Sequence, residues 1–330
     1  MIILPGDDGL RFEHMTGGVR VERRLLGRTG LEVSALGFGG APLGSEFGPI
    51  DEEEGRRAVR HALERGITYF DVAPYYGRTR AETLLGEALR GIRDRVVLAT
   101  KVGRYGKSNF DFRPERVLTS LEESLVRLRT DVIDVIFVHD IEFGELGTIL
   151  SETIPALERA RDQGKVRAIG VSGLPLPVLR RAIEGASLDV VLSYCHYHLA
   201  DTTLQGGLAS RAAEHGVGVV NASPLAMGLL TPEGPPEWHP APPALKAACR
   251  RAAEACAREG ADLAALALRF AVDTTIVATT LVGMPTVAHV DRNLESIARP
   301  LDHSLLERVR AVLEPVDGTT WPSGRPENSL

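Results

Sequence analysis

Short apolar segments alternate with amphipathic segments along most of this chain of 330 residues, and no other feature restricts the fold as strongly. The apolar segments are almost continuously apolar, which is typical of parallel strands that are covered on both faces. The expected strands lie at residues 35–40, 67–71, 96–101, 134–139, 166–172, 190–194, 217–223 and 275–283. The other segments have helical spacing and lie at residues 51–65, 81–90, 114–129, 150–163, 176–184, 203–215, 243–271 (two helices), 286–298 and 302–313.

A (β/α)8 barrel accounts for this alternation, because repeats of this kind over about 270 residues match the usual size of such a barrel. The main alternative is a doubly wound sheet, which needs the pattern GxGxxG after its first strand. The segment "GFGGAPLG" instead places Pro42 where the third glycine belongs. We therefore predict an α/β fold: a TIM barrel over residues 23–313, with an N-terminal β-hairpin at 23–34 and extra C-terminal helices. Residues 1–22 are expected to be an extension and residues 314–330 a tail.

Charge and hydropathy exclude several classes of partner. The net charge is −6 and the sequence has no basic cluster, which argues against nucleic acid as the main partner. The longest apolar runs are too short to span a bilayer, and the first residues do not resemble a signal peptide. Cys195, Cys249 and Cys256 have no metal-ligand spacing and cannot all pair, which indicates a reducing, cytoplasmic location. A small-molecule substrate is expected, and the sequence does not distinguish a monomer from a small homo-oligomer.

Polar residues stand at the ends of several of the expected strands. Active sites of (β/α)8 barrels lie at the carboxyl ends of the strands, so side chains at these positions gather on one rim. A single histidine or lysine after a strand is more often a surface group, but several ionisable groups at different strand ends favour a site. The residues at these positions are Asp71, Lys101, His139, Ser172, Tyr194 and Ser223.

Three of these residues, together with Tyr76, suggest proton-transfer chemistry. A phenol has an unperturbed pKa of about 10, so it is a poor base at neutral pH on its own. A nearby ammonium favours the phenolate, and a carboxylate would hold that ammonium charged and oriented. Tyr76 can supply the phenol, Lys101 the ammonium and Asp71 the carboxylate. His139 could donate a hydrogen bond to a substrate oxygen.

The motifs that carry these residues resemble those of the aldo-keto reductase superfamily. "DVAPYY" fits the pattern D-x-A-x-x-Y with Asp71 and Tyr76, "LATK" ends in Lys101, and "VIFVHD" contains His139. The opening "LGRTGLEVSALGFGG" and the later "GKVRAIGVS" and "SPLAMGLLT" are similar to family segments in the same order. The resemblance implies an oxidoreductase with Asp71, Tyr76, Lys101 and His139 as its catalytic tetrad and a nicotinamide cofactor.

A narrower likeness concerns the substrate. "LSYCHYHLADTTL", "VVNASPLAMGLLT" and "GPPEWHPAP" are similar to the subgroup of L-galactose dehydrogenases and neighbouring aldose 1-dehydrogenases. This implies oxidation of the anomeric C1 hydroxyl of a free aldose to an aldonolactone. Dehydrogenases of L-fucose, D-threo-aldoses, D-arabinose or pyridoxal remain alternatives, as does an NADPH-dependent reductase of aldehydes and ketones with broad specificity. A non-enzymatic regulatory subunit is a more remote alternative.

The resemblance also implies cofactor contacts, with departures from the usual pattern. Ser172 is followed by Gly173 where the family usually has asparagine, and Tyr194 stands at the position of a glutamine. Ala222 replaces an aromatic residue that stacks on nicotinamide in many members. The expected cofactor contacts are Gly39, Gly40, Ser172, Tyr194, Ser223, Leu225, Gly228, Gly283, Met284, His289, Arg292 and Asn293.

The segment "VGMPTVAHVDRN" bears on the choice between NAD and NADP. Members that prefer NADP bind its 2′-phosphate there with a Lys-Ser pair and a later arginine. Gly283, Met284 and His289 occupy those places in this chain, so a doubly charged phosphate would lack its strongest partners. We therefore predict NAD as the cofactor, with NADP left open.

Further residues are expected around the substrate. Tyr75, His139, His196 and Trp238 are the predicted substrate contacts. The run "CHYH" at 195–198 offers no complete ligand set, so no metal is expected. Trp321 could close the substrate pocket, and a disordered C-terminal end is the alternative.

Overall fold

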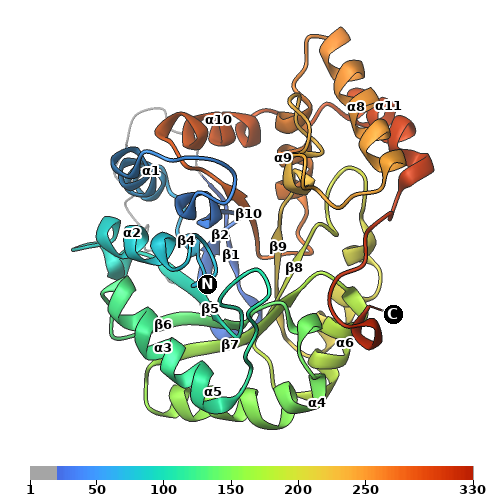
Figure 1. The fold of residues 1–330 in the computed structure, drawn as a ribbon. Helices are drawn as coiled ribbons and strands as arrows, with labels where there is room; N and C mark the ends of the chain where they lie inside the picture. The colour runs from blue at the N-terminus through green and yellow to red at the C-terminus, as the bar shows by residue number, and fades with distance from the viewer. Residues whose placement is uncertain (1–20, 330) are drawn as a thin grey trace, which may run out of the picture.

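The computed structural model describes residues 21–329 and contains a closed barrel of parallel strands, which confirms the predicted fold class. Nearly all of the predicted N-terminal extension lies outside the described residues. Around the barrel the strands follow one another in the order β10-β3-β4-β5-β6-β7-β8-β9 (Figure 1). Their bounds are β3 Leu36–Gly39, β4 Tyr69–Asp71, β5 Val97–Val102, β6 Ile133–Val138, β7 Val166–Gly173, β8 Val190–Tyr194, β9 Gly218–Ala222 and β10 Thr279–Gly283.

Helices surround the barrel on its outer side, as Figure 1 shows. Their buried faces pack against the apolar outer faces of the strands, so each strand is covered on both sides. Helices α8 and α11 pack against each other at one side of the ring. The helices are α1 Glu52–Glu64, α2 Arg80–Ala88, α3 Pro114–Leu128, α4 Leu146–Thr148, α5 Ile154–Asp162, α6 Leu176–Gly185, α7 Leu208–Glu214, α8 Pro243–Arg258, α9 Leu263–Asp273, α10 Val287–Ala298 and α11 His303–Leu313.

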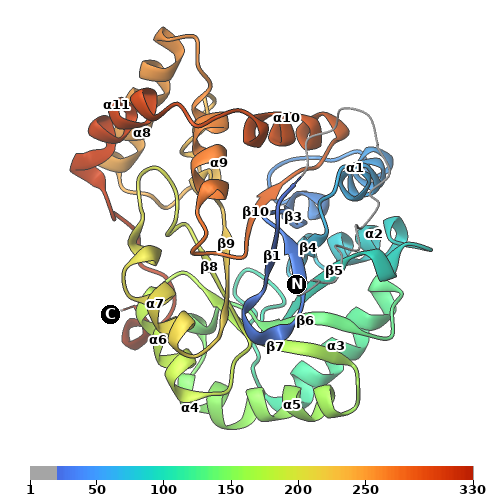
Figure 2. The same ribbon diagram turned by 180° about the vertical axis from the view of Figure 1, so that it is seen from behind.

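The predicted N-terminal hairpin fills the amino-terminal end of the barrel. It consists of the antiparallel strands β1 (Arg23–Leu25) and β2 (Glu32–Ser34), which lie across the barrel in Figure 2. Leu26 and Val33 are fully buried with the side chains of the barrel interior. The backbone N–H of Arg28 donates to Gly216 O at 2.9 Å, just before β9. With this end filled, the carboxyl end of the barrel is left for a site.

Two helices differ from the prediction for local reasons. The expected helix 150–163 begins with a wider π turn at Ile149–Thr153, and α5 starts only at Ile154. Pro155 lies at this junction and has no N–H to donate, so it interrupts the regular hydrogen bonding of the helix. The expected helix 203–215 is divided into a 3₁₀ turn at Thr203–Gln205 and α7, because Gly206 and Gly207 come between them.

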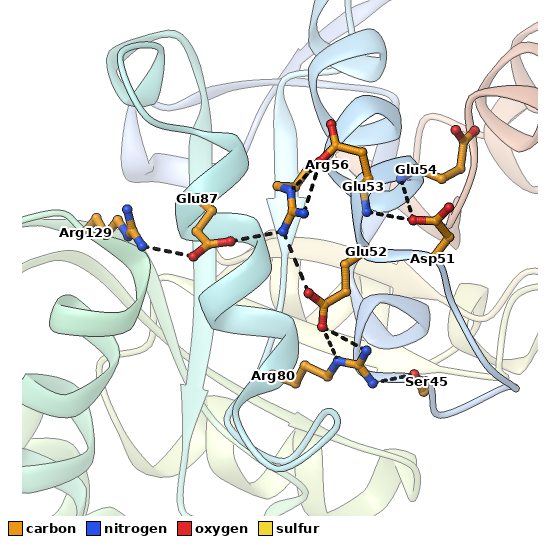
Figure 3. Close-up of polar contacts among 9 residues, drawn as sticks. All are labelled: Ser45, Asp51, Glu52, Glu53, Glu54, Arg56, Arg80, Glu87 and Arg129. Carbon is orange, nitrogen blue, oxygen red and sulfur yellow. Dashed lines mark hydrogen bonds and ion pairs between the residues drawn. The ribbon is translucent and has the colours of Figure 1, made fainter.

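Side-chain ion pairs connect the helices that flank the strands of the predicted site. Arg56 on α1 contacts Glu87 on α2 at 3.1 Å, and Glu87 also contacts Arg129 after α3 at 3.0 Å (Figure 3). Pairs as exposed as these contribute at most about 1 kcal/mol each. Glu82 on α2 is fully buried and accepts a hydrogen bond from Thr100 Oγ1 at 2.6 Å. Because Thr100 precedes Lys101, this bond helps to fix the carboxyl end of β5.

The C-terminal tail has a defined course. It leaves α11 and runs along the side of the molecule to α6, as the red segment of Figure 1 shows. The ring of Trp321 lies 5.1 Å from the ring of His239 in a T-shaped contact. Trp321 is not among the residues that line the cavities described below, so the expectation that it closes the substrate pocket is not met.

Within residues 21–329, no helix is both long and apolar enough to cross a membrane. The three cysteines are buried and form no disulfide.

Candidate active site

Asp71 and Lys101 form a buried ion pair at the carboxyl ends of two neighbouring strands. Asp71 ends β4 and is 3% exposed, and Lys101 lies on β5 and is 1% exposed. The Lys101 ammonium contacts the Asp71 carboxylate and donates to Val72 O at 2.9 Å. Burial alone would lower the pKa of Lys101, but Asp71 and Tyr76 raise it above its ordinary value. Lys101 is therefore a cation held in a fixed position.

Tyr76 lies on the turn that follows β4, beside this pair. The turn is fixed by a close approach of two backbones, because a Cβ on Gly77 would collide with Gly44, and Gly77 has a φ of 61°. The N–H of Gly77 donates to Glu46 Oε1 at 2.8 Å. As a result, the Tyr76 ring lies over the barrel mouth, with its centroid 4.9 Å from Lys101 Nζ.

The acidity of Tyr76 differs from the prediction. Burial raises the pKa of Tyr76 to about 12, although the charge of Lys101 acts to lower it. The direction of the lysine effect is therefore as predicted, but the loss of hydration is the larger effect. At neutral pH the Tyr76 side chain is a phenol that can donate a proton, and it becomes a base only at alkaline pH.

His139 completes the group from the next strand. It follows β6, is 5% exposed, and its ring meets the Tyr76 ring edge-on, with centroids 5.8 Å apart at 88°. Burial, together with the charges of Lys101 and Arg104, holds the pKa of His139 well below its usual range. His139 is therefore a neutral imidazole. Its N–H can donate a hydrogen bond to a substrate oxygen without bringing in another charge.

The four residues converge on a cavity of about 270 Å³ that opens into a second cavity of about 850 Å³. Besides the tetrad, the structure brings Tyr75, Ser172, Tyr194, Ser223 and Trp238 to the smaller cavity. The two cavities share Tyr76, Ala222 and Ser223, so they form one continuous cleft. Of the predicted cofactor residues, the larger cavity is lined by Gly39, Gly40, Ser223, Leu225, Gly228, Gly283 and His289.

Several predicted contacts lie elsewhere. The Met284 side chain is fully buried in the core, and neither Arg292 nor Asn293 of α10 lines either cavity. His196 is also absent from both linings: its Nδ1 lies 3.1 Å from Asp201 Oδ2 and 3.0 Å from Thr203 Oγ1. The proposed roles of these side chains in binding therefore have no support in the geometry.

The backbone of the loop after β9 offers N–H donors to an anion. Ser223, Ala226, Met227 and Gly228 all have positive φ, which curls the chain around the cavity wall. The N–H of Leu225 has no acceptor among residues 21–329. The N–H of Gly228, a residue that also lines the larger cavity, donates to Leu225 O at 3.0 Å. Such curled loops with free N–H groups can hold a phosphate oxygen.

Sequence reasoning missed Arg104, which lines the smaller cavity. Its guanidinium contacts the Asp140 carboxylate and lies 3.9 Å from the centroid of the Tyr75 ring. The lining of the cavity thus contains a fixed cation besides Lys101. In the segment "KVGRYG" this arginine stands two residues after the strand end, so the sequence does not indicate whether its side chain faces the cavity or solvent.

The described residues contain no group of histidine, cysteine, aspartate or glutamate side chains that could hold a metal ion. The reactive groups of the cleft are thus an ion pair, a phenol and a neutral imidazole. This set suits proton transfer coupled to a redox step, for which amino-acid side chains have no hydride acceptor of their own and a cofactor is needed. The larger cavity can accommodate such a cofactor, because its glycine-lined wall leaves the backbone exposed beside the catalytic groups.

The barrel and the side chains of this site are typical of an oxidoreductase, and comparison with known proteins identifies the family. Residues 35–314 match the Aldo/keto reductase family, and the chain belongs to that family. It is therefore an oxidoreductase of a family whose enzymes use nicotinamide cofactors.

Individual relatives agree with this assignment. The chain is 46% identical over 319 residues to L-galactose dehydrogenase of Arabidopsis thaliana, covering 94% of this chain and 99% of that protein. It is 30% identical to D-threo-aldose 1-dehydrogenase of a Pseudomonas species, covering 82% and 91%. An aldo-keto reductase of Bacillus halodurans, solved in its holo form, superimposes with a TM-score of 0.74 at 27% identity, covering 94% of this chain and all of that one.

Tyr76→Phe removes the hydroxyl that the site offers for proton transfer. We expect kcat to fall by at least about 100-fold, while cofactor binding, followed by fluorescence quenching, stays within about twofold. The matched control is Tyr75→Phe, the neighbouring tyrosine of the same cavity, which should keep kcat within about tenfold. Turnover retained in the Tyr76 variant would show that another group transfers the proton.

Proposed function

We propose that this protein oxidises the anomeric hydroxyl of a free aldose, with NAD as hydride acceptor and an aldonolactone as product. One observation carries the proposal: Tyr76, Lys101 and His139 converge on one cavity in a chain that is 46% identical to L-galactose dehydrogenase over almost its full length. L-Galactose is therefore the first sugar to test.

The smaller cavity suits a polyhydroxylated substrate. Arg104 and Tyr75 present hydrogen-bonding groups, and Trp238 presents an aromatic face. The Arg104 guanidinium is held by Asp140, so it can donate to a sugar hydroxyl without reorganising. Polar groups fixed in this way select a ligand by its hydroxyl positions, because an unmatched buried donor is costly.

The chain's own residues have definite parts in this reaction. In the oxidation, the proton of the C1 hydroxyl passes to the oxygen of ionised Tyr76, and the hydrogen on C1 leaves as hydride. The exocyclic C1–O bond becomes a carbonyl, and because C1 stays bonded to the ring oxygen, the product is a lactone. A bound nicotinamide ring supplies the hydride acceptor. Lys101 stabilises the ionised Tyr76, and the neutral imidazole of His139 donates to the C1 oxygen.

Charge favours NAD over NADP. Among residues 21–329, the lining of the larger cavity includes no lysine or arginine, whereas Glu46 and Glu233 are present. Pro285 and His289 line the far end of this cavity, which therefore lies at the first turn of α10. There the N–H of Val287, which could otherwise serve an anion, donates to Glu54 Oε1 of α1 at 2.9 Å. Hydrogen bonds from Val287 N–H and Arg57 lower the pKa of Glu54, so a carboxylate charge occupies this helix end.

The direct test is NAD reduction by purified protein, scanned across L-galactose, L-fucose, D-arabinose and pyridoxal. We expect the highest kcat/KM for a sugar of the L-galactose type, a lower value with NADP than with NAD, and a product that reacts with hydroxylamine as an ester does. Faster NADPH-linked reduction of simple aldehydes than oxidation of any sugar would instead support a carbonyl reductase of broad specificity.

Glu54→Gln tests the charge argument, because glutamine can still accept from Val287 N–H but carries no charge. We expect kcat/KM with NADP to rise by roughly three- to tenfold while the value with NAD changes by less than about twofold. The control is Glu53→Gln, the exposed neighbour that pairs with Arg56, which should change neither value. An unaltered NADP value in the Glu54 variant would contradict this account of cofactor choice.

A further inference from the structure

The C-terminal tail is fastened to the loop that follows β6, close to the catalytic histidine. Asn328 is 2% exposed, and its Nδ2 donates to Glu142 O at 3.1 Å and to Gly144 O at 2.9 Å. The N–H of Arg325 also donates to Glu142 O, at 2.9 Å. Gly324 has a φ of 80°, and a Cβ there would collide with the Glu142 backbone. The tail and this loop therefore meet backbone to backbone.

The tail also contacts the side chain of Glu142. Ser323 Oγ donates to Glu142 Oε1 at 3.0 Å, and the N–H of Leu174, just after β7, donates to the same oxygen at 3.2 Å. Glu142 is fully buried, and its Oε2 has no hydrogen-bond partner among residues 21–329. Burial, and after it the charge of Asp140, raises the pKa of Glu142 to about 8. A neutral carboxylic acid is the form that this environment favours.

Glu142 connects the tail to the wall of the catalytic cleft. The hydroxyl of Tyr194, which lines the cavity, donates to Glu142 Oε1 at 3.4 Å. A Cβ on Gly173 would lie 2.5 Å from Glu142 Oε2, so the carboxyl group occupies the space that a side chain at 173 would need. One buried carboxyl group thus explains why residue 173 is a glycine, and it also contacts Tyr194.

We propose that Glu142 is a positioning residue for the cofactor: held from behind by residues 323–328, it fixes Tyr194 as the wall against which the nicotinamide end of the cofactor lies. The C-terminal tail then takes part in cofactor binding without touching the cofactor. This inference rests on the proposed nicotinamide cofactor. It predicts that damage to the tail weakens cofactor binding more than sugar binding.

The experiment compares full-length variants by the Kd for NAD, from fluorescence quenching, and by the KM for the sugar. Glu142→Ala should raise the Kd for NAD by about tenfold, as expected for the loss of a buried hydrogen-bonded support, with the sugar KM changed by less than about twofold. Glu142→Gln keeps a neutral group that can accept from Tyr194 and Ser323, so it should restore the Kd to within about twofold of wild type. Asn328→Ala should raise the Kd in the same direction, and the exposed Glu327→Gln is the matched control that should not.

The outcomes separate this proposal from the proposed function. If wild-type protein does not bind NAD, the proposed cofactor is wrong. If wild type binds NAD and the folded Glu142→Ala and Asn328→Ala variants bind it equally well, the positioning role is wrong, even where their melting temperatures fall. If Glu142→Ala does not fold, the Kd of Asn328→Ala decides, and an unchanged value overturns the proposal.

Discussion

The buried ion pair between Asp71 and Lys101 is the interaction on which the site depends. Each charge would be costly to bury alone, and their contact across β4 and β5 offsets that cost only while both strands keep their register. The barrel imposes this register, because its strands are closed into a ring and its amino-terminal end is filled by the hairpin. The strand ends that carry the ion pair are thus held in register by a closed barrel whose opposite end is packed.

The same burial has a consequence for chemistry. Excluding water strengthens the influence of Lys101 on Tyr76, but it also disfavours the phenolate, and the second effect is larger. The neutral state of His139 has the same origin. The site is therefore arranged to hold a proton on Tyr76 at neutral pH, and the oxidation of a sugar requires that this proton be absent.

The sequence predicted the barrel, and the meeting of Asp71, Tyr76, Lys101 and His139 at one rim, for physical reasons. Continuous apolar strands with helical segments between them leave few possible folds, and polar residues at strand ends meet on one rim in a parallel barrel. Pro155 and the pair Gly206-Gly207 changed the helices only locally. Which way a side chain turns in a loop was much harder to predict. His196 turns toward Asp201 rather than the cavity, and Met284 turns into the core.

Long-range contacts were outside the reach of sequence reasoning. The position of Arg104 is set by its contacts with Asp140 and Tyr75. Glu142 contacts the C-terminal tail, and its partner Ser323 lies 181 residues further along the chain. No periodicity or motif indicates such pairs. For the same reason, the sign of the pKa shift of Tyr76 needed the burial that only the folded structure supplies.

The pH dependence of sugar oxidation tests the central claim most directly. A base acts only when deprotonated, and a pKa raised to about 12 leaves Tyr76 mostly protonated at neutral pH, so each increase in pH enlarges the active fraction. Measured as kcat/KM for the sugar at saturating NAD, activity should rise steadily between about pH 6 and pH 10 in wild type. A value that stays constant over this range, or falls as the pH rises, would contradict the account of Tyr76 as the group that takes the proton.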